Sequence, residues 1–271
     1  IPVLFIMSPL IKMFPVGLGL KILFVAAILL VLIFGLCLPV LGFLKHKKRW
    51  SYGFFTLAII SFFVAHFNSQ FTEESPKPNS LVYALDADKN TAVWATYDKI
   101  LDTYTTNFLG ETPGEAKAFG NNTFGSKYGT GFSYSKSAPI KNIPQPKIEI
   151  SNDTIIGNLR SYNICIVSQR HIQRIELFSD TTNVFHSFKI NGVKIEKKTE
   201  EDSAVFNHRK SNRLFCYYVT NDEPLELEIS VPKNQKTSIE LYEASNDLLD
   251  NELFSIPKRS KDMMPKPFVL N

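Results

Sequence analysis

Two long apolar runs, separated by a short basic segment, occupy the first quarter of this chain. Residues 22–44 form a run of 23 residues without a charged side chain, and residues 51–67 form a second run of 17. As a helix, the first run extends about 35 Å, enough to cross the ~30 Å hydrocarbon core of a bilayer. The second run lies at the short end of the spanning range. The sequence therefore predicts two transmembrane helices, forming a helical hairpin, within residues 17–67.

The composition of the first run distinguishes it from a buried helix of a soluble protein. Such a helix keeps one polar face, whereas "ILFVAAILLVLIFGLCLPVLGFL" has none. Pro39 and Gly42 would break a soluble helix, but a membrane helix tolerates them where neighbouring groups satisfy the freed backbone. We therefore expect lipid around this run.

Positive charge is concentrated between the two runs. The fixed charges there are Lys45, Lys47, Lys48 and Arg49. Short loops rich in Lys and Arg stay on the cytoplasmic side of a membrane, and Trp50 and Tyr52 suit the aromatic belt at that boundary. We expect residues 45–49 to be a cytoplasmic loop of an integral membrane protein. The chain after residue 67 then lies on the other side, in the periplasm or an organelle lumen.

The charge of the remaining chain argues against nucleic acid as a partner. Residues 1–69 hold six of the 30 basic residues and no acidic one, which leaves 24 basic against 26 acidic residues in 70–271. Binding to nucleic acid needs clustered Lys and Arg on the extramembrane part. Since that part is slightly acidic, we expect the lipid bilayer as a partner and no nucleic acid.

The start of the chain is already apolar and contains Pro2, Pro9 and Pro15. It lacks the order of a secretory signal, in which a charged segment precedes a short apolar stretch and a cleavage site. We expect residues 1–16 to be the end of a preceding membrane span and its connector, in a chain truncated from a larger membrane protein. A processed mature N-terminus is the alternative.

Beyond residue 67 the apolar pattern changes from helical to alternating. Residues 68–79 are polar and contain proline, which is typical of a linker. Nine or so short β-branched or aromatic runs follow, at residues 80–87, 91–97, 147–151, 163–168, 173–179, 184–196, 213–220, 225–231 and 237–244. The pair Asn191 and Gly192 between two of these runs is a strong hairpin signal. We expect residues 80–271 to form a mostly antiparallel, extracytoplasmic β-sandwich domain.

Two segments show helical spacing in place of alternation. Residues 97–109 place Ile100, Leu101, Tyr104 and Phe108 three or four positions apart, which predicts a helix. Residues 245–254 are a second, shorter candidate.

Residues 119–140 are rich in Gly and aromatic side chains and show no apolar periodicity. Aromatic side chains on long loops often contact ligands, so Phe124, Tyr128 and Phe132 are candidate binding residues. The alternative is a surface excursion packed on its own rings.

Motifs of catalysis and metal binding are missing from the sequence. The five histidines follow no helical metal spacing such as H-E-x-x-H, and neither G-x-S-x-G nor a phosphate loop occurs. Asp86, Asp88 and Asn90 match the start of a calcium loop, but Thr91 and Tyr97 replace the Gly and Glu that it needs. We therefore predict no catalytic, cofactor-binding or metal-ligating residue in this chain.

The three cysteines form no C-x-x-C pair. Cys37 lies in the first predicted span, and Cys165 and Cys216 lie in predicted strands. Outside the cytoplasm these last two can form a disulfide, and the sequence leaves open whether they do.

The block of residues 78–98 contains Asn79, Ser80, Tyr83, Asp86, Asp88, Ala92 and Trp94. It resembles a block that follows the last membrane helices of multi-spanning zinc peptidases. These are the endoplasmic reticulum metallopeptidase and vacuolar membrane protease family of aminopeptidase-like di-zinc exopeptidases. Residues 168–177 and 14–21 look like two further shared blocks, so the resemblance covers residues 14–271. It is a similarity of blocks and layout, without a catalytic signature.

The resemblance implies a parent protein with a peptidase domain that holds two zinc ions, followed by membrane helices and a β-rich domain. In such a peptidase, metal-activated water cleaves the peptide. This chain matches the last helices and the final domain, so zinc is expected only in an upstream domain. No catalytic residue is carried over, and the implied partners are that peptidase domain and a peptide substrate.

Three functions remain open from the sequence. The first is the membrane-anchor and β-domain portion of a zinc metallopeptidase, a hydrolase. The second is a membrane-tethered β-sandwich module that binds a glycan or peptide through residues 119–140. The third is a structural subunit of an envelope complex.

Overall fold

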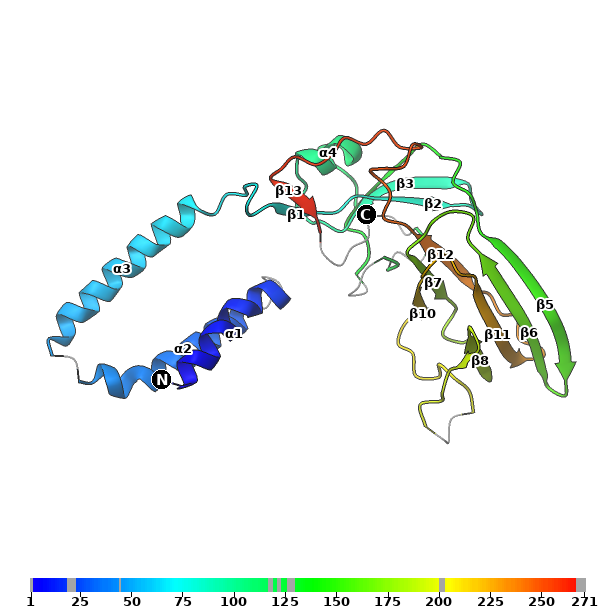
Figure 1. Cartoon of the computed structure of the whole chain (residues 1–271), viewed down its shortest axis with the longest axis horizontal. Coiled ribbons are helices and arrows are strands. Elements are labelled where there is room, and N and C mark those ends of the chain that lie inside the picture. The colour runs from blue at the N-terminus through cyan, green and yellow to red at the C-terminus, as the bar shows by residue number, and fades with distance from the viewer. Residues whose placement is uncertain are drawn as a thin grey trace. The chain divides into compact units, whose positions relative to one another are not determined.

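The computed structural model describes residues 2–18, 23–43, 45–116, 119–120, 123–125, 130–199 and 203–266. The chain divides into two compact units, Ile1–Gln70 and Phe71–Asn271. The first unit is helical, and the second is built mainly of antiparallel β-sheets (Figure 1). A mostly antiparallel β-rich part after a helical part is what the sequence predicts.

The helical unit contains α1 (Pro2–Leu18), α2 (Leu23–Leu41) and α3 (Lys47–Phe67), and α1 contacts α2. Among the helices in the described ranges, α3 is the one long and apolar enough to cross a membrane. The apolar stretches Val3–Phe14 and Phe24–Pro39 are shorter. No residue of α3 is buried within the chain, so its apolar surface has no partner there.

The helix predicted as the second membrane span begins earlier than its apolar run. Lys47, Lys48 and Arg49 form the first turn of α3 in place of a loop, and His46 before them has a left-handed backbone with φ of 60°. Positive charges at a helix N-terminus oppose the helix dipole. We infer that this first turn extends the helix into a region where water or anionic groups compensate these charges.

The second unit, which we call the extramembrane unit after its predicted location, contains a small three-stranded sheet of β2 (Val82–Asp86), β3 (Thr91–Thr96) and β4 (Tyr134–Ser137). The predicted strands on either side of residues 86–90 pair antiparallel, which confirms that turn. Asp86 caps it by accepting a hydrogen bond from the Lys89 N–H, and Asn90 supplies the left-handed residue.

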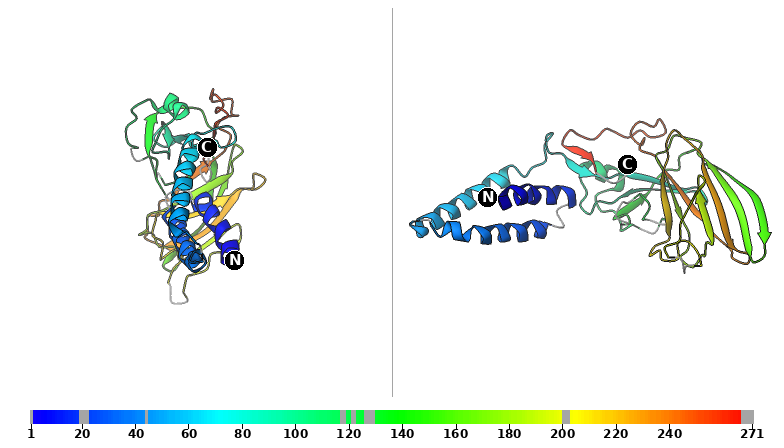
Figure 2. Two further views of the ribbon diagram at one scale, coloured as in Figure 1. Left: turned by 90° about the vertical axis from the view of Figure 1, so that its left-hand side faces the viewer. Right: turned by 60° about the horizontal axis from the view of Figure 1, so that its bottom comes forward.

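This unit also contains two larger antiparallel sheets (Figure 2). One has the order β5 (Lys147–Ile156), β6 (Leu159–Val167), β11 (Leu225–Pro232), β8 (Ser187–Ile190), β9 (Val193–Lys194). The other has the order β10 (Arg213–Tyr218), β7 (Arg174–Phe178), β12 (Glu240–Ala244). The Asn191 and Gly192 turn joins β8 to β9 with positive φ at both residues, which confirms the predicted hairpin.

Both sheets contribute to one hydrophobic core. On β11, Leu225, Leu227, Ile229 and Val231 are buried and alternate with more exposed residues. They pack with apolar side chains of β7, β8 and β10 in a single cluster. The period-two pattern of the sequence therefore matches the inward face of the sheet.

β7 is buried along its whole length, since both of its faces are covered. Ile175 and Leu177 belong to the core between the sheets. On the opposite face, the Gly125 N–H donates to Glu176, and the Tyr242 ring packs against Phe178. A buried glutamate therefore lies in the central strand, which bears on the site below.

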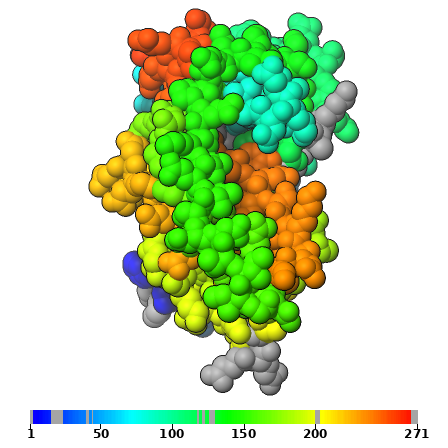
Figure 3. All heavy atoms as spheres, turned by 90° about the vertical axis from the view of Figure 1, so that its right-hand side faces the viewer, coloured from blue at the N-terminus to red at the C-terminus, as the bar shows by residue number. Residues whose placement is uncertain are grey.

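β5 is the opposite case, an edge strand whose ten residues are all exposed. It lies open along one face of the molecule (Figure 3). Ile148, Ile150, Ile155 and Ile156 are at least half exposed. Asn152, with φ of 53°, lies at a break in the pairing register with β6, and such bulges limit further strand pairing at an edge.

A polar network joins the beginning of the extramembrane unit to its end. β1 (Lys77–Asn79) pairs in parallel with β13 (Met263–Pro265). The Asp98 carboxylate accepts hydrogen bonds from the Ser80 N–H at 2.6 Å and the Lys266 ammonium at 2.9 Å. β1 lies within the range that the sequence predicts as linker, because its pairing partner is almost 190 residues away.

The predicted helix at 97–109 is too long, because α4 spans only Thr103–Leu109. Asp102 is its N-cap and forms a capping box with Thr105, so the helix cannot extend further back. Tyr97 and Asp98 are instead buried beside β3. The helix proposed at 245–254 is also wrong, since this segment forms successive turns.

Asp102 has a lowered pKa although burial alone would raise it, because the Thr105 N–H and the Asn79 amide bond its carboxylate. A carboxyl group whose pKa is lower in the folded than in the unfolded chain stabilises the fold at pH values above its unfolded pKa of about 3.9. This contribution is lost as the pH falls through the folded pKa. We expect Asp102→Ala to lower the free energy of unfolding by about 0.5–2 kcal/mol at pH 7. Urea titration of the detergent-solubilised full chain, read by Trp94 fluorescence in a Trp50→Phe background, measures it.

The matched control for this change is Asp88→Ala in the exposed turn, which should have no comparable effect. The difference between the native chain and Asp102→Ala should shrink below pH 4. A difference that stays constant down to pH 2 would contradict the role of the ionised carboxylate.

Candidate functional site

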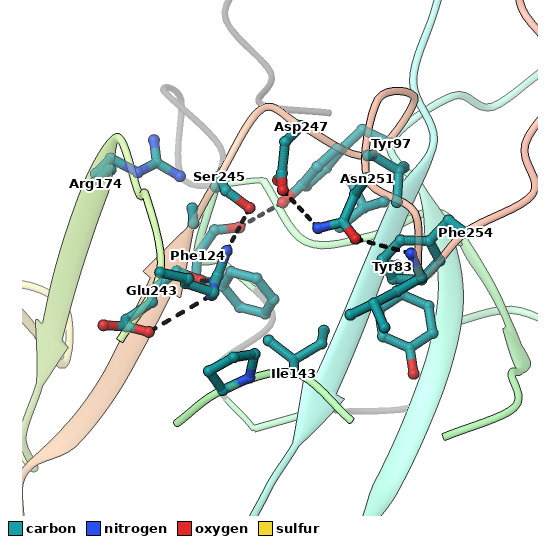
Figure 4. A pocket seen from close by; sticks show the side chains of 17 residues that line it. Tyr83, Tyr97, Phe124, Ile143, Arg174, Glu243, Ser245, Asp247, Asn251 and Phe254 are labelled. Atoms are coloured by element: carbon teal, nitrogen blue, oxygen red, sulfur yellow. Dashed lines mark hydrogen bonds and ion pairs between the residues drawn. The ribbon is translucent and has the colours of Figure 1, made fainter. Parts of the chain in front are cut away.

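A cavity of about 320 Å³ lies in the extramembrane unit, between β2 and the ends of β7 and β12 (Figure 4). We call it the Arg170–Glu243 cavity. Its charged lining residues are Arg170, Arg174, Glu243 and Asp247. Its aromatic lining residues are Tyr83, Tyr97, Phe124 and Phe254. Figure 4 shows Arg174 and Glu243 on one side and Tyr83 and Phe254 on the other.

The strand register explains how distant residues meet here. β7 pairs with β12 so that Arg174 lies opposite Ala244. Glu243 precedes Ala244 at the end of β12, and the turns after it bring Asp247 to the cavity. The strand register thus brings these charged residues together at one end of the sheet formed by β10, β7 and β12.

Arg174 and Glu176 form a buried ion pair on β7, with the Arg174 Nη2 atom 2.9 Å from the Glu176 Oε1 atom. Arg213 lies 3.4 Å from the other carboxylate oxygen, and the Gly125 N–H donates to Oε1. The negative charge of Glu176 is therefore paired with two arginine side chains. Arg174, whose side chain is only 7% exposed, has an Nε atom without a hydrogen bond in the described part of the chain.

Arg170 lies beside Glu243 with the Nε and Oε2 atoms 3.8 Å apart. Its Nη1 atom donates to the Ser245 hydroxyl at 2.5 Å, which fixes the guanidinium. Burial raises the pKa of Glu243, which a hydrogen bond from Ser168 and the Arg170 charge only partly offset. The Glu243 Oε1 atom is buried without a hydrogen bond among the described residues.

Asp247 completes the polar side. Burial alone would raise the pKa of its carboxyl group, but hydrogen bonds from Ser245 and Asn251 and the nearby Arg170 charge lower it. The Asn251 amide donates to Asp247 at 2.6 Å. Asp247 is therefore ionised at neutral pH, whereas the Glu243 carboxyl group takes up a proton more readily.

The aromatic side is supported from behind by a ring cluster. The Trp94 ring contacts Tyr83 at 5.1 Å and Phe254 at 6.0 Å between centroids. Tyr97 hydrogen-bonds the Phe124 carbonyl, and burial followed by the Glu176 charge raises its pKa, so its hydroxyl stays neutral. Trp94 is thus a natural reporter of changes in the cavity wall.

The predicted binding loop contributes one wall of this cavity. Phe124 lines it and stacks on Tyr242 with centroids 4.6 Å apart. Phe132 is 7% exposed and packs against Tyr97 and Phe124, so it supports the wall from inside. Tyr128 lies outside the described residues.

Gly125 next to this wall has a conformation that favours glycine, with φ of 77°. A Cβ atom there would lie 2.9 Å from the Tyr97 hydroxyl and 3.5 Å from the Arg174 Nη2 atom. The backbone therefore approaches Arg174 closely, and the glycine-rich composition of this loop has a structural reason.

The chemistry of the cavity is that of binding through charge and hydrogen bonds. In the part of the chain that the structure describes, no three His, Cys, Asp or Glu side chains gather as a metal site, so the residues present do not fit zinc. Cys165 and Cys216 are free thiols. Among the described residues, two that line the cavity, Arg174 and Glu243, each have a buried polar side-chain atom without a hydrogen bond.

Comparison with protein-family models, with curated proteins and with solved structures finds no match for this chain. The resemblance to membrane zinc peptidases therefore stays a prediction from the sequence blocks.

Sequence reasoning missed the charged residues of the cavity. Arg170 and Arg174 lie in residues 168–177, a block noted only for its resemblance. Glu243 lies in a predicted strand, and nothing local marks it as buried. The one usable signal was a pair of arginines four positions apart at the start of an apolar strand.

The raised pKa of Glu243 gives a testable pH dependence. A carboxyl group whose folded pKa is raised stabilises the fold below the unfolded pKa of about 4.3, and this contribution is lost as the pH rises through the folded pKa. We expect the native chain to lose stability relative to Glu243→Gln as the pH rises above the unfolded pKa of about 4.3. Urea titration with the Trp94 readout measures the difference.

Glu226→Gln, at an exposed position of β11, is the control and should track the native chain throughout. If Glu243→Gln and the native chain kept a constant difference as the pH rises, Glu243 would not be a buried, perturbed acid.

Proposed function

We propose that this chain is a membrane-anchored binding module whose extramembrane unit takes up a small ligand in the Arg170–Glu243 cavity. The observation that carries the proposal is the cavity itself, about 320 Å³ in volume and lined by four charged and four aromatic residues. Arg174 and Glu243, two of these charged residues, each also have a buried polar atom without a hydrogen bond among the described residues. Burying such atoms without partners costs free energy.

The proposed anchor is a transmembrane hairpin, followed by a β-sandwich made by the two larger sheets. The length and composition of α3 support a membrane span. The shared core of the five-stranded and three-stranded sheets supports the sandwich. We place residues 45–49 in the cytoplasm and the extramembrane unit in the periplasm or an organelle lumen.

A second proposal concerns the parent protein. We infer from the sequence blocks that this module belongs to a membrane zinc metallopeptidase whose catalytic domain lies upstream of residue 1. Asn79, Ser80 and Trp94, which carry the resemblance, belong to the polar network and the ring cluster. Such residues support kinship of fold, while the proposed zinc ligands belong to the upstream domain.

The binding proposal is tested with the full chain carrying Trp50→Phe, which leaves Trp94 as the one tryptophan of the two in the sequence. Neutral sugars, amino acids, short peptides and their capped forms are titrated while its emission is recorded. At least one class should cause a saturable change. Ala244→Phe, which fills the cavity from the end of β12, should abolish it.

The control is an equally bulky change away from the cavity, Val193→Phe on the exposed strand β9. This variant should bind as the native chain does. If no class of compound changes the Trp94 emission of the folded native chain, the binding function is wrong.

The proposed sidedness is tested by cysteine labelling. The three cysteines are first replaced by serine. A membrane-impermeant maleimide is then added to sealed cells, spheroplasts or vesicles in which the non-cytoplasmic face of the membrane meets the reagent. Lys47→Cys should be protected there. Lys210→Cys, on an exposed turn, should be labelled. The reverse pattern would invert the topology.

The proposed parent is tested by reading the coding sequence upstream of residue 1. A preceding domain with a His-x-Asp and Glu-Glu metal set is the expected finding. A reading frame without such a set would refute the peptidase proposal and would leave the binding proposal standing.

A further inference from the structure

Asn152, Asp153 and Thr154 form the sequence Asn-X-Thr, in which X is not proline. This is the acceptor sequence for N-linked glycosylation in proteins of the secretory pathway, and we call it the Asn152 sequon. Three-residue matches are common by chance, so the structural context decides whether this one can carry a glycan. The context required is an exposed asparagine whose side chain the fold does not use.

The Asn152 sequon lies on the outermost strand of the larger sheet. β5 is the edge strand of the five-stranded sheet, and all ten of its residues are exposed. The strand lies open along one face of the molecule (Figure 3). An oligosaccharide attached to β5 can therefore extend into solvent without disturbing the hydrophobic core.

The bulge in β5 releases Asn152 from the regular strand pairing. The register of β5 with β6 breaks between Ser151 and Thr154, and Asn152 lies inside this break with a φ of 53°. In the described part of the chain its side chain has no hydrogen bond or ion pair, whereas the neighbouring Asp153 is held by Arg160 at 2.6 and 2.8 Å. The amide group of Asn152 is therefore available for modification.

The exposed surface of β5 gives a second reason for a glycan at this place. Ile148, Ile150, Ile155 and Ile156 are each at least half exposed. An apolar edge strand pairs with other chains unless charges, bulges or covering groups prevent it. A bulky hydrophilic group in the middle of β5 adds to the protection that the bulge provides.

We propose that Asn152 carries an N-linked oligosaccharide. The donor is an oligosaccharide whose anomeric carbon is joined to a lipid diphosphate, and the side-chain amide nitrogen of Asn152 attacks that carbon. The bond from the anomeric carbon to the diphosphate oxygen breaks and a carbon–nitrogen bond forms. The amide loses one proton, and the lipid diphosphate leaves. This inference rests on the proposed sidedness of the extramembrane unit, with an organelle lumen as the compartment, and is independent of the cavity.

The left-handed backbone offers a competing explanation for asparagine at position 152. Asn and Gly are the residues that adopt this conformation most readily, so the side chain could serve the bulge alone. The two explanations differ in what they require of Thr154. Glycosylation needs its hydroxyl group, whereas the bulge does not.

Peptide mass spectrometry of the full chain, isolated from the membranes of the cells that make it, tests the proposal. Trypsin cleaves after Lys147 and Arg160, and the resulting peptide contains Asn152 and Asn158, of which only Asn152 begins a sequon. The glycosidase that releases N-linked glycans converts the acceptor asparagine to aspartate, and heavy-oxygen water labels that aspartate. We expect the label at Asn152 in most copies of the chain and none at Asn158.

Three variants of the full chain, expressed in eukaryotic cells, separate the two explanations. Thr154→Ser keeps the sequon and should keep the glycan, whereas Thr154→Val has nearly the native shape and should lose it. Asn152→Gly accepts the left-handed backbone and should also lose the glycan. If the native chain carried no glycan, or if Thr154→Val kept the glycan of the native chain, the proposal would be wrong.

Lys89→Asn is the control for the compartment. It introduces an Asn-X-Thr sequence that ends at Thr91, in the exposed turn between β2 and β3. This variant should be glycosylated at position 89 if the extramembrane unit lies in the lumen. A further natural sequon begins at Asn121, outside the described residues, and it falls on a separate tryptic peptide.

The outcomes separate this inference from the sidedness on which it rests. A glycan at position 89 of Lys89→Asn, with none at Asn152, would overturn the inference and keep the sidedness. Absence of a glycan from both positions would overturn both.

Discussion

The carboxylate of Asp98 connects the two ends of the extramembrane unit, and this connection fixes where the chain enters and leaves the unit. It accepts from the Ser80 backbone at the start of the unit and from the Lys266 ammonium at its end. β1 and β13 have only three residues each, and two strands of this length do not hold together by their ladder alone. The buried polar contacts around Asp98 and Asn79 supply the missing stability, because unpaired groups there would each incur a desolvation cost.

This connection also positions the cavity. β2 continues directly from Ser80 and carries Tyr83 into the aromatic wall, while the charged wall belongs to β7 and β12. The two walls are joined by the loop at Phe124 and Gly125, through the stacking of Phe124 on Tyr242 and the hydrogen bond to Glu176. A cavity built between two sheets in this way takes its shape from contacts on both sides. The shape of the cavity therefore depends also on residues that do not line it.

The strands were predictable from the sequence because their burial is set locally. β11 alternates buried and exposed residues, and the Asn191 and Gly192 turn requires only its own backbone. The partner of β1 was not predictable, since parallel pairing across the whole unit leaves no local pattern. The cavity was not predictable for the same reason. Arg170 and Glu243 are more than 70 residues apart, and each alone has the appearance of a solvated charge.

The buried charges of the cavity argue for a binding role on energetic grounds. A fold gains little from an ion pair out of water, and apolar residues of similar size are often as stable. Glu243, with its raised pKa and unbonded oxygen, is therefore a cost to the free protein. For the proposed binding function, this cost means that a ligand which pairs with the polar lining would be favoured over one that leaves it unpaired.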